Sequence, residues 1–273
     1  MAGSWRQGWL EVDGVRLEYA RCGVSNDGAP TLVFLHEGLG CVALWKDFPE
    51  RLAQATGCGA FVYSRAGYGR SDPAPLPRPV RFMHEEGLAV LPRVLEAAGI
   101  DRFVLVGHSD GASISIIYAG SGAARGLEGL ILEAPHVFNE DISQQGIQAA
   151  KVAYETTELR RRLQRYHGDN VDCAFWGWND VWLDPDFRAW NIEEFLPGIT
   201  VPTLVIQGEA DNYGTLEQVR AVERQAGAAV ESRILPGCGH SPHAEMPSEA
   251  LAAMIAFLES WNLTAGGRVP PAT

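Results

Sequence analysis

Apolar residues in this chain recur in short runs that alternate with segments in which apolar residues have helical spacing. The runs predict strands at residues 9–12, 15–19, 31–36, 60–64, 102–106, 129–133, 203–207 and 231–235. The periodic segments predict helices at residues 44–55, 82–98, 109–119, 216–225 and 248–261. Pro92 should bend or break the second helix, and Asp13-Gly14 indicates an antiparallel hairpin between the first two strands. Together these elements predict an α/β fold with a mostly parallel eight-stranded sheet covered by helices on both faces.

The alternation is interrupted at residues 136–195, which read as polar and helical and then become rich in aromatic side chains. We interpret this segment as a helical cap, or lid, inserted after the sixth strand. Residues 1–135 and 196–263 would then be the two parts of the α/β core. The Gly- and Pro-rich residues 264–273 are expected to form a disordered tail.

Composition narrows the classes of partner. A hydrophobic content of 46% is typical of a globular protein, and a net charge of −12 disfavours both nucleic acid and anionic membranes. The five cysteines form no Cys-x-x-Cys pair, which favours free thiols in a reducing compartment. Neither a signal peptide nor a membrane span is recognisable. We therefore expect a cytoplasmic protein with no nucleic-acid or membrane partner; a homo-oligomer stays open.

The strand at 102–106 runs directly into Gly-x-Ser-x-Gly at residues 107–111, followed by a helix. The two glycines lie where a β-carbon would collide with neighbouring backbone, so Ser109 can occupy a tight turn with its oxygen exposed. A nucleophilic serine needs a base and an acid that orients the base, and an open parallel sheet gathers such groups at the carboxyl ends of its strands. Asp211 follows the seventh predicted strand and His240 follows the eighth. These three residues are the candidate catalytic set.

With this set of residues, the chain resembles the α/β-hydrolase superfamily over about residues 9–262. The resemblance is carried by residues 35–38, 64–71, 107–111, 208–211 and 239–245. Within the superfamily it looks most similar to small bacterial carboxylesterases and to the carbon–carbon bond hydrolases that act on meta-cleavage products of aromatic catabolism. The resemblance implies the α/β-hydrolase fold and a Ser-His-Asp triad that uses neither a cofactor nor a metal.

By the same resemblance Ser109 is the nucleophile, His240 the base and Asp211 the acid. The oxyanion hole would be formed by the backbone N–H of Asp110 and one N–H from Gly38 or Leu39.

Glu37 departs from the pattern, because many relatives have glycine directly after the first-loop histidine. A carboxylate pointing inward would oppose the negative charge that develops on the oxyanion. Three arrangements remain open: Glu37 points away, pairs with an arginine such as Arg65, or is protonated in place. Glu37, Phe138, Trp176 and Trp178 are the candidate substrate-pocket residues, although the aromatic residues are more often the core of a cap.

Other roles for these residues must be weighed. Ser109 and Asp211 could be helix caps, Glu133 and Glu209 are substitute acids, and His243 is a rival to the base. His108 and His36 are interpreted as structural. The glycines at 38–43 also match a dinucleotide fingerprint, but an NADP reductase would leave the Ser-Asp-His set unexplained.

The sequence therefore predicts a serine hydrolase that cleaves a small carboxylic ester through an acyl-enzyme. Its substrate would be a small-molecule ester or a compound derived from an aromatic. Carbon–carbon bond hydrolysis, cofactor-free perhydrolysis and a ligand receptor on a hydrolase scaffold are the alternatives.

Overall fold

The computed structural model describes residues 5–23 and 28–265. Its described part contains an eight-stranded sheet with the order β1-β2-β4-β3-β5-β6-β7-β8. The strands are β1 (Arg6–Val12), β2 (Val15–Cys22), β3 (Thr31–Leu35), β4 (Gly59–Tyr63), β5 (Phe103–His108), β6 (Leu127–Glu133), β7 (Thr203–Gly208) and β8 (Val230–Leu235). β2 is antiparallel to β1 and β4, and all other neighbours are parallel. The predicted mostly parallel eight-stranded α/β sheet is confirmed.

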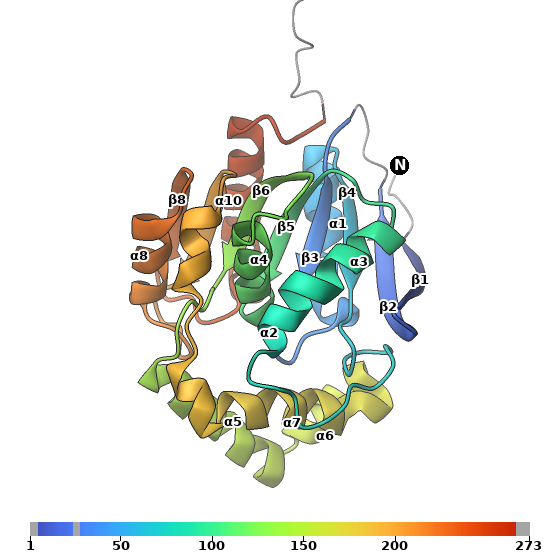
Figure 1. Cartoon of the computed structure of the whole chain (residues 1–273), viewed down its shortest axis with the longest axis vertical. Coiled ribbons are helices and arrows are strands. Elements are labelled where there is room, and N and C mark those ends of the chain that lie inside the picture. Colours follow the sequence, from blue (N-terminus) through green and yellow to red (C-terminus); the bar gives the residue numbers. More distant parts are fainter. Residues whose placement is uncertain (1–4, 24–27, 266–273) are drawn as a thin grey trace, which may run out of the picture.

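Helices pack on both faces of the sheet, as its buried strands require (Figure 1). One face is covered by α1 (Phe48–Thr56) and α10 (Pro247–Ser260), whose buried residues share a core with Leu32 and Phe34 of β3. The other face is covered by α3 (Leu91–Ala97), α4 (Asp110–Gly120) and α8 (Leu216–Gln225). Val33 and Leu35, which alternate with Leu32 and Phe34, point into this second core.

Local sequence explains the turns and breaks. Asp13 and Gly14 both have positive φ, 52° and 79°, as a two-residue hairpin turn that matches the twist of its strands requires. The helix predicted at 82–98 is divided into α2 (Phe82–Glu85), a π-helical stretch η2 (Glu86–Val90) and α3, with Pro92 in the first turn of α3. Proline is tolerated there because the first helical N–H groups need no helical acceptor.

Between β6 and β7 the chain forms α5 (Asp141–Thr156), α6 (Leu159–His167) and α7 (Val171–Trp182). In Figure 1 these helices lie together beyond one end of the sheet. Hydrogen bonds show that this is the end at which β4 and β5 finish. Asn170 donates to the carbonyls of Gly69 and Ser71 in the loop after β4, and Trp182 donates to Asp110, just after β5. Helices therefore occupy the segment where the sequence predicts a cap, over the carboxyl ends of the strands.

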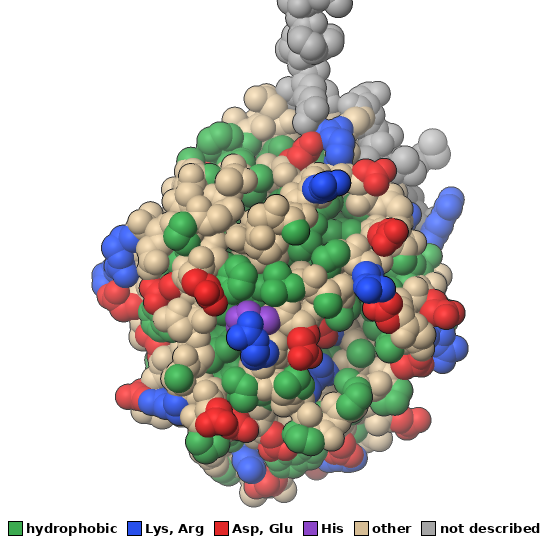
Figure 2. All heavy atoms as spheres, in the orientation of Figure 1, with side chains coloured by type: hydrophobic (Ala, Val, Ile, Leu, Met, Phe, Trp, Pro, Cys, Tyr) green, Lys and Arg blue, Asp and Glu red, His purple; other side chains and the backbone are tan. Residues whose placement is uncertain are grey.

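Short 3-10 turns and one further helix complete the described fold. They are η1 (Val42–Trp45), η3 (Gly168–Asn170), η4 (Pro185–Ala189), η5 (Glu193–Gly198) and α9 (Pro242–Glu245). Of the predicted disordered tail, residues 266–273 lie outside the described part of the chain. No helix within residues 5–23 and 28–265 has the length and apolar character needed to cross a membrane. On the face shown in Figure 2, basic side chains are scattered among acidic ones and form no continuous basic patch.

Candidate active site

The turn between β5 and α4 consists of Ser109 alone, with φ 52° and ψ −117°. This backbone conformation is unfavourable for a residue with a side chain, by about 1–3 kcal/mol. The flanking glycines permit it: a β-carbon on Gly107 would lie 2.5 Å from the carbonyl oxygen of Gly111, and one on Gly111 would lie 2.1 Å from that of Leu35. The Ser109 side chain makes no capping hydrogen bond to α4, so the simple N-cap role does not apply.

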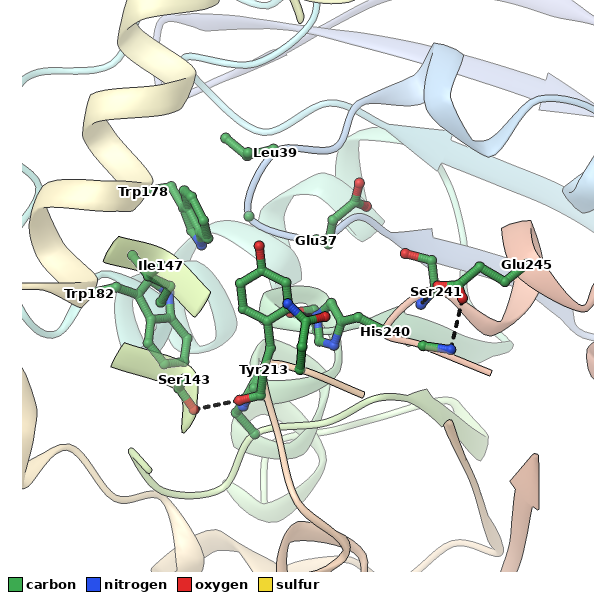
Figure 3. Close-up of a pocket in the computed structure, with 15 residues that line it drawn as sticks. Glu37, Leu39, Ser143, Ile147, Trp178, Trp182, Tyr213, His240, Ser241 and Glu245 are labelled. Atoms are coloured by element: carbon green, nitrogen blue, oxygen red, sulfur yellow. Dashed lines mark hydrogen bonds between the residues drawn. The ribbon is translucent and has the colours of Figure 1, made fainter. Parts of the chain in front are cut away.

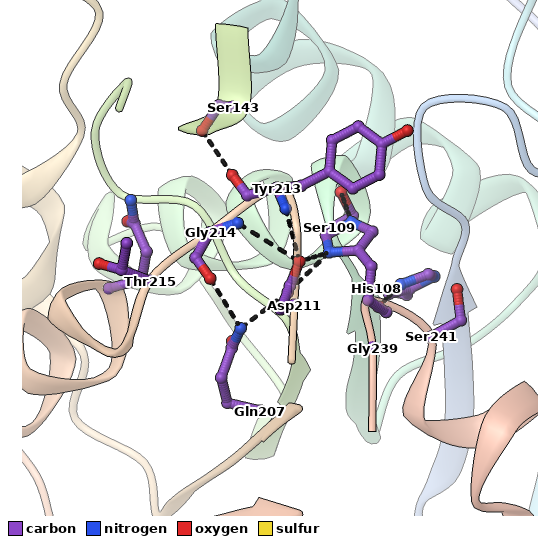
Figure 4. A network of polar contacts seen from close by, with 12 residues as sticks. His108, Ser109, Ser143, Gln207, Asp211, Tyr213, Gly214, Thr215, Gly239 and Ser241 are labelled. Carbon is purple, nitrogen blue, oxygen red and sulfur yellow. Dashed lines mark hydrogen bonds and ion pairs between the residues drawn. The ribbon is translucent and has the colours of Figure 1, made fainter. Parts of the chain in front are cut away.

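Ser109 lies at one end of a hydrogen-bonded chain of three side chains (Figure 4). Its Oγ is 2.9 Å from Nε2 of His240, and Nδ1 of His240 is 2.8 and 3.0 Å from the two carboxylate oxygens of Asp211. When Nδ1–H donates to the carboxylate, Nε2 is left as an acceptor for the serine hydroxyl. The arrangement can deprotonate Ser109 as it attacks a carbonyl carbon.

Asp211 is buried but remains ionised because its surroundings favour the charged form. Burial raises its pKa, while the hydrogen bond and charge of His240 and the backbone N–H of Tyr213 lower it, and the net pKa lies below the ordinary value. Tyr213 N donates to one oxygen at 2.7 Å, and the Gln207 side-chain amide donates to the other at 2.7 Å. Asp211 therefore has a fixed orientation toward the imidazole.

The residues that could have replaced Asp211 or His240 in the catalytic set make other contacts or are exposed. Glu133 accepts a hydrogen bond from Nδ1 of His243 at 2.7 Å, so the substitute acid and the rival base pair with each other. Glu209 is exposed. The N-cap of α8 is Thr215, whose hydroxyl accepts from the backbone N–H of Glu217, so Asp211 does not cap this helix.

A cavity of about 480 Å³ opens beside Ser109 and His240. In Figure 3 an apolar wall of Ile147, Trp178 and Trp182 faces a polar wall of Glu37, Ser241 and Glu245, with Tyr213 and His240 between them. Among the described residues that line the cavity there is no lysine or arginine. The lining residues are Glu37, Gly38, Leu39, Ser109, His136, Ser143, Ile147, Trp178, Trp182, Asn212, Tyr213, Gly239, His240, Ser241 and Glu245.

Comparison with known proteins shows the family to which this chain belongs. The model of the alpha/beta hydrolase family matches residues 32–254, which is most of the chain. The chain is an α/β hydrolase.

Individual relatives of this hydrolase are distant. Proline iminopeptidase of Lactobacillus helveticus is 23% identical, over 85% of this chain and 89% of the relative. N-formylmaleamate deformylase of Pseudomonas putida is 27% identical, over 73% and 76%. Among solved structures, naproxen esterase from Bacillus subtilis superposes with a TM-score of 0.70 at 15% identity, covering 94% of this chain and 92% of the other. At that identity the structural likeness concerns the fold alone.

In this α/β hydrolase Glu37 is neither paired with Arg65 nor protonated in place, two of the three arrangements expected from the sequence. Its Oε2 lies 3.4 Å from Nδ1 of His108. Burial raises the pKa of Glu37, but the adjacent His108 and the charges of other histidines lower it by more, and the net pKa is well below its usual range. Burial lowers the pKa of His108, but Glu37 outweighs it and raises the pKa to about 9. The two side chains therefore form an ion pair at neutral pH.

Arg65, the expected partner of Glu37, bonds to backbone instead. Its guanidinium donates to the carbonyl oxygens of His36 and Glu37 and lies 4.0 Å from the carboxylate of Asp110. Arg65 therefore fixes the backbone of the loop after β3 rather than neutralising the Glu37 side chain. His108, which the sequence marks as structural, also bonds through Nε2 to the carbonyl oxygen of His240 at 2.8 Å.

The same loop contains the amides expected to form an oxyanion hole. Within the described residues, the backbone N–H groups of Gly38, Leu39 and Asp110 donate to no protein acceptor. The indole of Trp178 packs directly on Gly38, since a β-carbon there would lie 2.1 Å from the ring. Glycine at 38 thus lets an aromatic wall approach the loop that faces Ser109.

Two of the four predicted pocket residues, Glu37 and Trp178, line the cavity, and Phe138 and Trp176 do not. Positions 176 and 178 point to different sides of α7, because two residues correspond to a rotation of about 200° on a helix. Trp176 instead packs edge-on against Tyr154, with ring centroids 5.5 Å apart. Phe138 forms an isolated β-bridge with Asn191 and lies two residues after His136, which does line the cavity.

Sequence reasoning missed His136 and Glu245, which both line the cavity. Glu245 accepts hydrogen bonds from the backbone N–H groups of Gly239 and Ser241, at 2.7 and 2.9 Å, and so fixes the loop on both sides of His240. His136 follows β6 in the way that Asp211 and His240 follow β7 and β8. The signal that found those two residues, a titratable side chain just after a strand, was therefore also present at His136.

Proposed function

We propose that this α/β hydrolase cleaves a small carboxylic ester through an acyl-enzyme, with Ser109 as nucleophile, His240 as general base and Asp211 as the orienting acid. The observation that carries the proposal is the hydrogen-bonded chain from Ser109 Oγ through His240 to Asp211, open to a cavity of about 480 Å³. The volume fits a small-molecule substrate.

The reaction runs in two halves. His240 Nε2 takes the proton of Ser109 as Oγ attacks the ester carbonyl carbon, and the protonated imidazole then gives that proton to the departing alcohol oxygen. The acyl group is left on Oγ. Water then loses a proton to His240 and attacks the acyl carbon, and the proton passes to Oγ as the acid leaves. Asp211 holds the tautomer and stabilises the imidazolium in both halves.

The oxyanion of each tetrahedral intermediate would be bound by the N–H of Asp110 and by that of Gly38 or Leu39. One such donor is commonly worth about 10²–10³ in kcat. The Glu37 carboxylate beside this loop is compatible with the proposal, because its charge is matched by the protonated His108. The ion pair replaces the neutral glycine of many relatives without leaving an uncompensated negative charge next to the oxyanion.

The names of the relatives, an iminopeptidase, a deformylase and an esterase, favour hydrolysis of an acyl bond without selecting one substrate. We propose that α5–α7 act as the cap, since Ile147, Trp178 and Trp182 from these helices form one wall of the cavity. The triad supplies nucleophile, base and acid, so the proposed reaction needs neither a cofactor nor a metal. Cytoplasmic location stays a prediction.

The test is hydrolysis of p-nitrophenyl esters from acetate to decanoate by the wild type, Ser109→Ala and Ser115→Ala. Ser115 is a matched control, because it is a buried serine of α4, the helix that follows Ser109, and its hydroxyl donates to the carbonyl of Gly111. We expect Ser109→Ala to lose at least about a thousandfold in kcat, and Ser115→Ala to keep most of its activity. Turnover by a folded Ser109→Ala above about a hundredth of wild type would exclude Ser109 as nucleophile.

A further inference from the structure

His136 is held firmly against the cavity by the segment that follows β6. The chain turns at Ala134, which has a φ of 45° that is unusual for a residue with a side chain. The hydroxyl of Ser113 donates to the His136 carbonyl at 2.6 Å, and the next backbone N–H, of Val137, donates to Gln218 at 2.7 Å. The His136 side chain is 2% exposed and lines the same cavity as Ser109. Its position is therefore fixed by the fold.

The imidazole of His136 is neutral. Burial lowers its pKa, and the nearby charge of His240 lowers it further, to about 3. At neutral pH the ring consequently presents one N–H donor and one nitrogen acceptor.

Neither ring nitrogen of His136 has a hydrogen-bond partner in the described part of the chain, and Nδ1 is fully buried. The neighbours of the ring are other rings: Trp182, edge-on at 5.1 Å between centroids, and His240 at 5.6 Å. The Nδ1–Cε1 edge faces Gly214, about 3.5 Å from where a β-carbon would lie. Nε2, which unlike Nδ1 is not among the fully buried unpartnered atoms, is thus the nitrogen left for a ligand.

The cavity walls indicate which chemical group would bind there. Glu37 and Glu245 line the cavity without a lysine or arginine among the lining residues, so an anionic group would lose its water opposite two carboxylates. Glu37 is already paired with His108, and Glu245 with two backbone N–H groups, so neither is free to bind a cation. A neutral imidazole beside the apolar wall suits an uncharged hydrogen-bonding group.

We propose that His136 is a substrate-binding residue, whose imidazole hydrogen-bonds an uncharged polar group, such as a hydroxyl or a carbonyl, close to the scissile ester. The substrate class is then a neutral ester with such a group a few bonds from the carbonyl that Ser109 attacks. This deepens the proposed function and rests on it. It disfavours substrates that carry a carboxylate.

Two pairs of probe substrates test the proposal. p-Nitrophenyl 3-hydroxybutyrate is compared with p-nitrophenyl butyrate, and 2-hydroxyethyl butyrate with propyl butyrate, so that the hydroxyl is on either side of the ester. The wild type should prefer the hydroxylated member of at least one pair by about tenfold in kcat/KM, mostly through KM. p-Nitrophenyl hemisuccinate, which is anionic, should react at least about tenfold more slowly than the butyrate.

Variants assign the preference to His136. His136→Phe and His136→Leu should abolish it, and His136→Gln, which retains a donor and an acceptor, should restore part of it. His84→Phe is the matched control, because His84 is also buried with an unpartnered Nδ1 but packs on Phe195 away from the cavity. A wild type without preference in either pair, or a preference that survives in a folded His136→Phe or His136→Leu, would overturn the proposal.

A separate measurement distinguishes failure of this proposal from failure of the proposed function. The probe esters are titrated into Ser109→Ala, in which they should bind without turnover, and binding is followed by calorimetry. Tighter binding of the hydroxylated ester that depends on His136 supports the binding role even if the wild type hydrolyses none of the probes. Equal binding of both members of each pair contradicts it even if hydrolysis is fast.

Discussion

The ion pair between Glu37 and His108 gives a residue-scale prediction. Glu37 raises the pKa of His108 to about 9, so removing its charge in Glu37→Gln should move the His108 titration to lower pH, as followed by NMR. A raised histidine pKa stabilises the fold fully below about pH 6.5, and this contribution is lost as the pH rises through 9.

The free energy of unfolding of the wild type should therefore fall more between pH 7 and 10 than that of Glu37→Gln. Glu209→Gln, an exposed carboxylate, is the control and should follow the wild type. An unchanged His108 titration in Glu37→Gln would contradict the pairing.

Asp110, the residue after the nucleophile, should also couple stability to pH. Its burial raises its pKa to about 6, despite Arg65 and the Trp182 N–H, which both lower it. The folded state then binds this proton more tightly than the unfolded state, so stability is lost as the pH rises from about 4 to 6. Asp110→Asn keeps an acceptor for Trp182 and should lack this loss, by about 2–3 kcal/mol between pH 4 and 7.5.

Urea unfolding of wild type and Asp110→Asn at several pH values measures the difference. Asp101→Asn, which removes an exposed carboxylate, serves as the control. Parallel stability–pH curves for the wild type and Asp110→Asn would show that Asp110 does not titrate in this range.

At the scale of elements, sequence patterns located the strands and the helices of the α/β core, because each pattern is local. The turn at Ser109 was predictable from its two glycines, and the parallel topology then brought Asp211 and His240 to the same edge as the serine. The π-helical stretch at Glu86–Val90 was not predictable, because it depends on how the helix packs. The partner of Glu37 was also missed, because the loop after β3, which contains Glu37, and the end of β5, which contains His108, meet only in the folded chain.

The two faces of α7 give an element-scale prediction about acyl-chain length. Trp178 lines the cavity and Trp176, two residues earlier, does not. Trp178→Ala should enlarge the cavity and move the preferred p-nitrophenyl ester to a longer chain, and it should lower the free energy of unfolding by about 3–5 kcal/mol. Trp176→Ala should leave the chain-length profile unchanged. Equal profiles for both variants would return Trp178 to a purely structural role.

For the whole molecule, the site is assembled from loops that follow five strands of the central sheet. Glu37 follows β3, Ser109 follows β5 and His136 follows β6, while Asp211 and His240 follow β7 and β8. Apolar cores on both faces of the sheet fix the relative positions of these loop ends. Active-site geometry in this hydrolase therefore depends on the packing of the entire sheet.

Arg65 connects the loop after β4 with the loop after β3 and with the start of α4, and it gives a prediction for global stability. It is buried after β4, donates to the carbonyls of His36 and Glu37, and faces Asp110 at the start of α4. Arg65→Met removes the donors and leaves a buried carboxylate without its cation, so urea unfolding at pH 7.5 should give a free energy about 3–5 kcal/mol lower. Adding Asp110→Asn should recover part of this loss, because one of the two buried carboxyl groups near Arg65, Asp110 and Glu86, is then uncharged. Additive losses in the double variant would mean that the two side chains act independently.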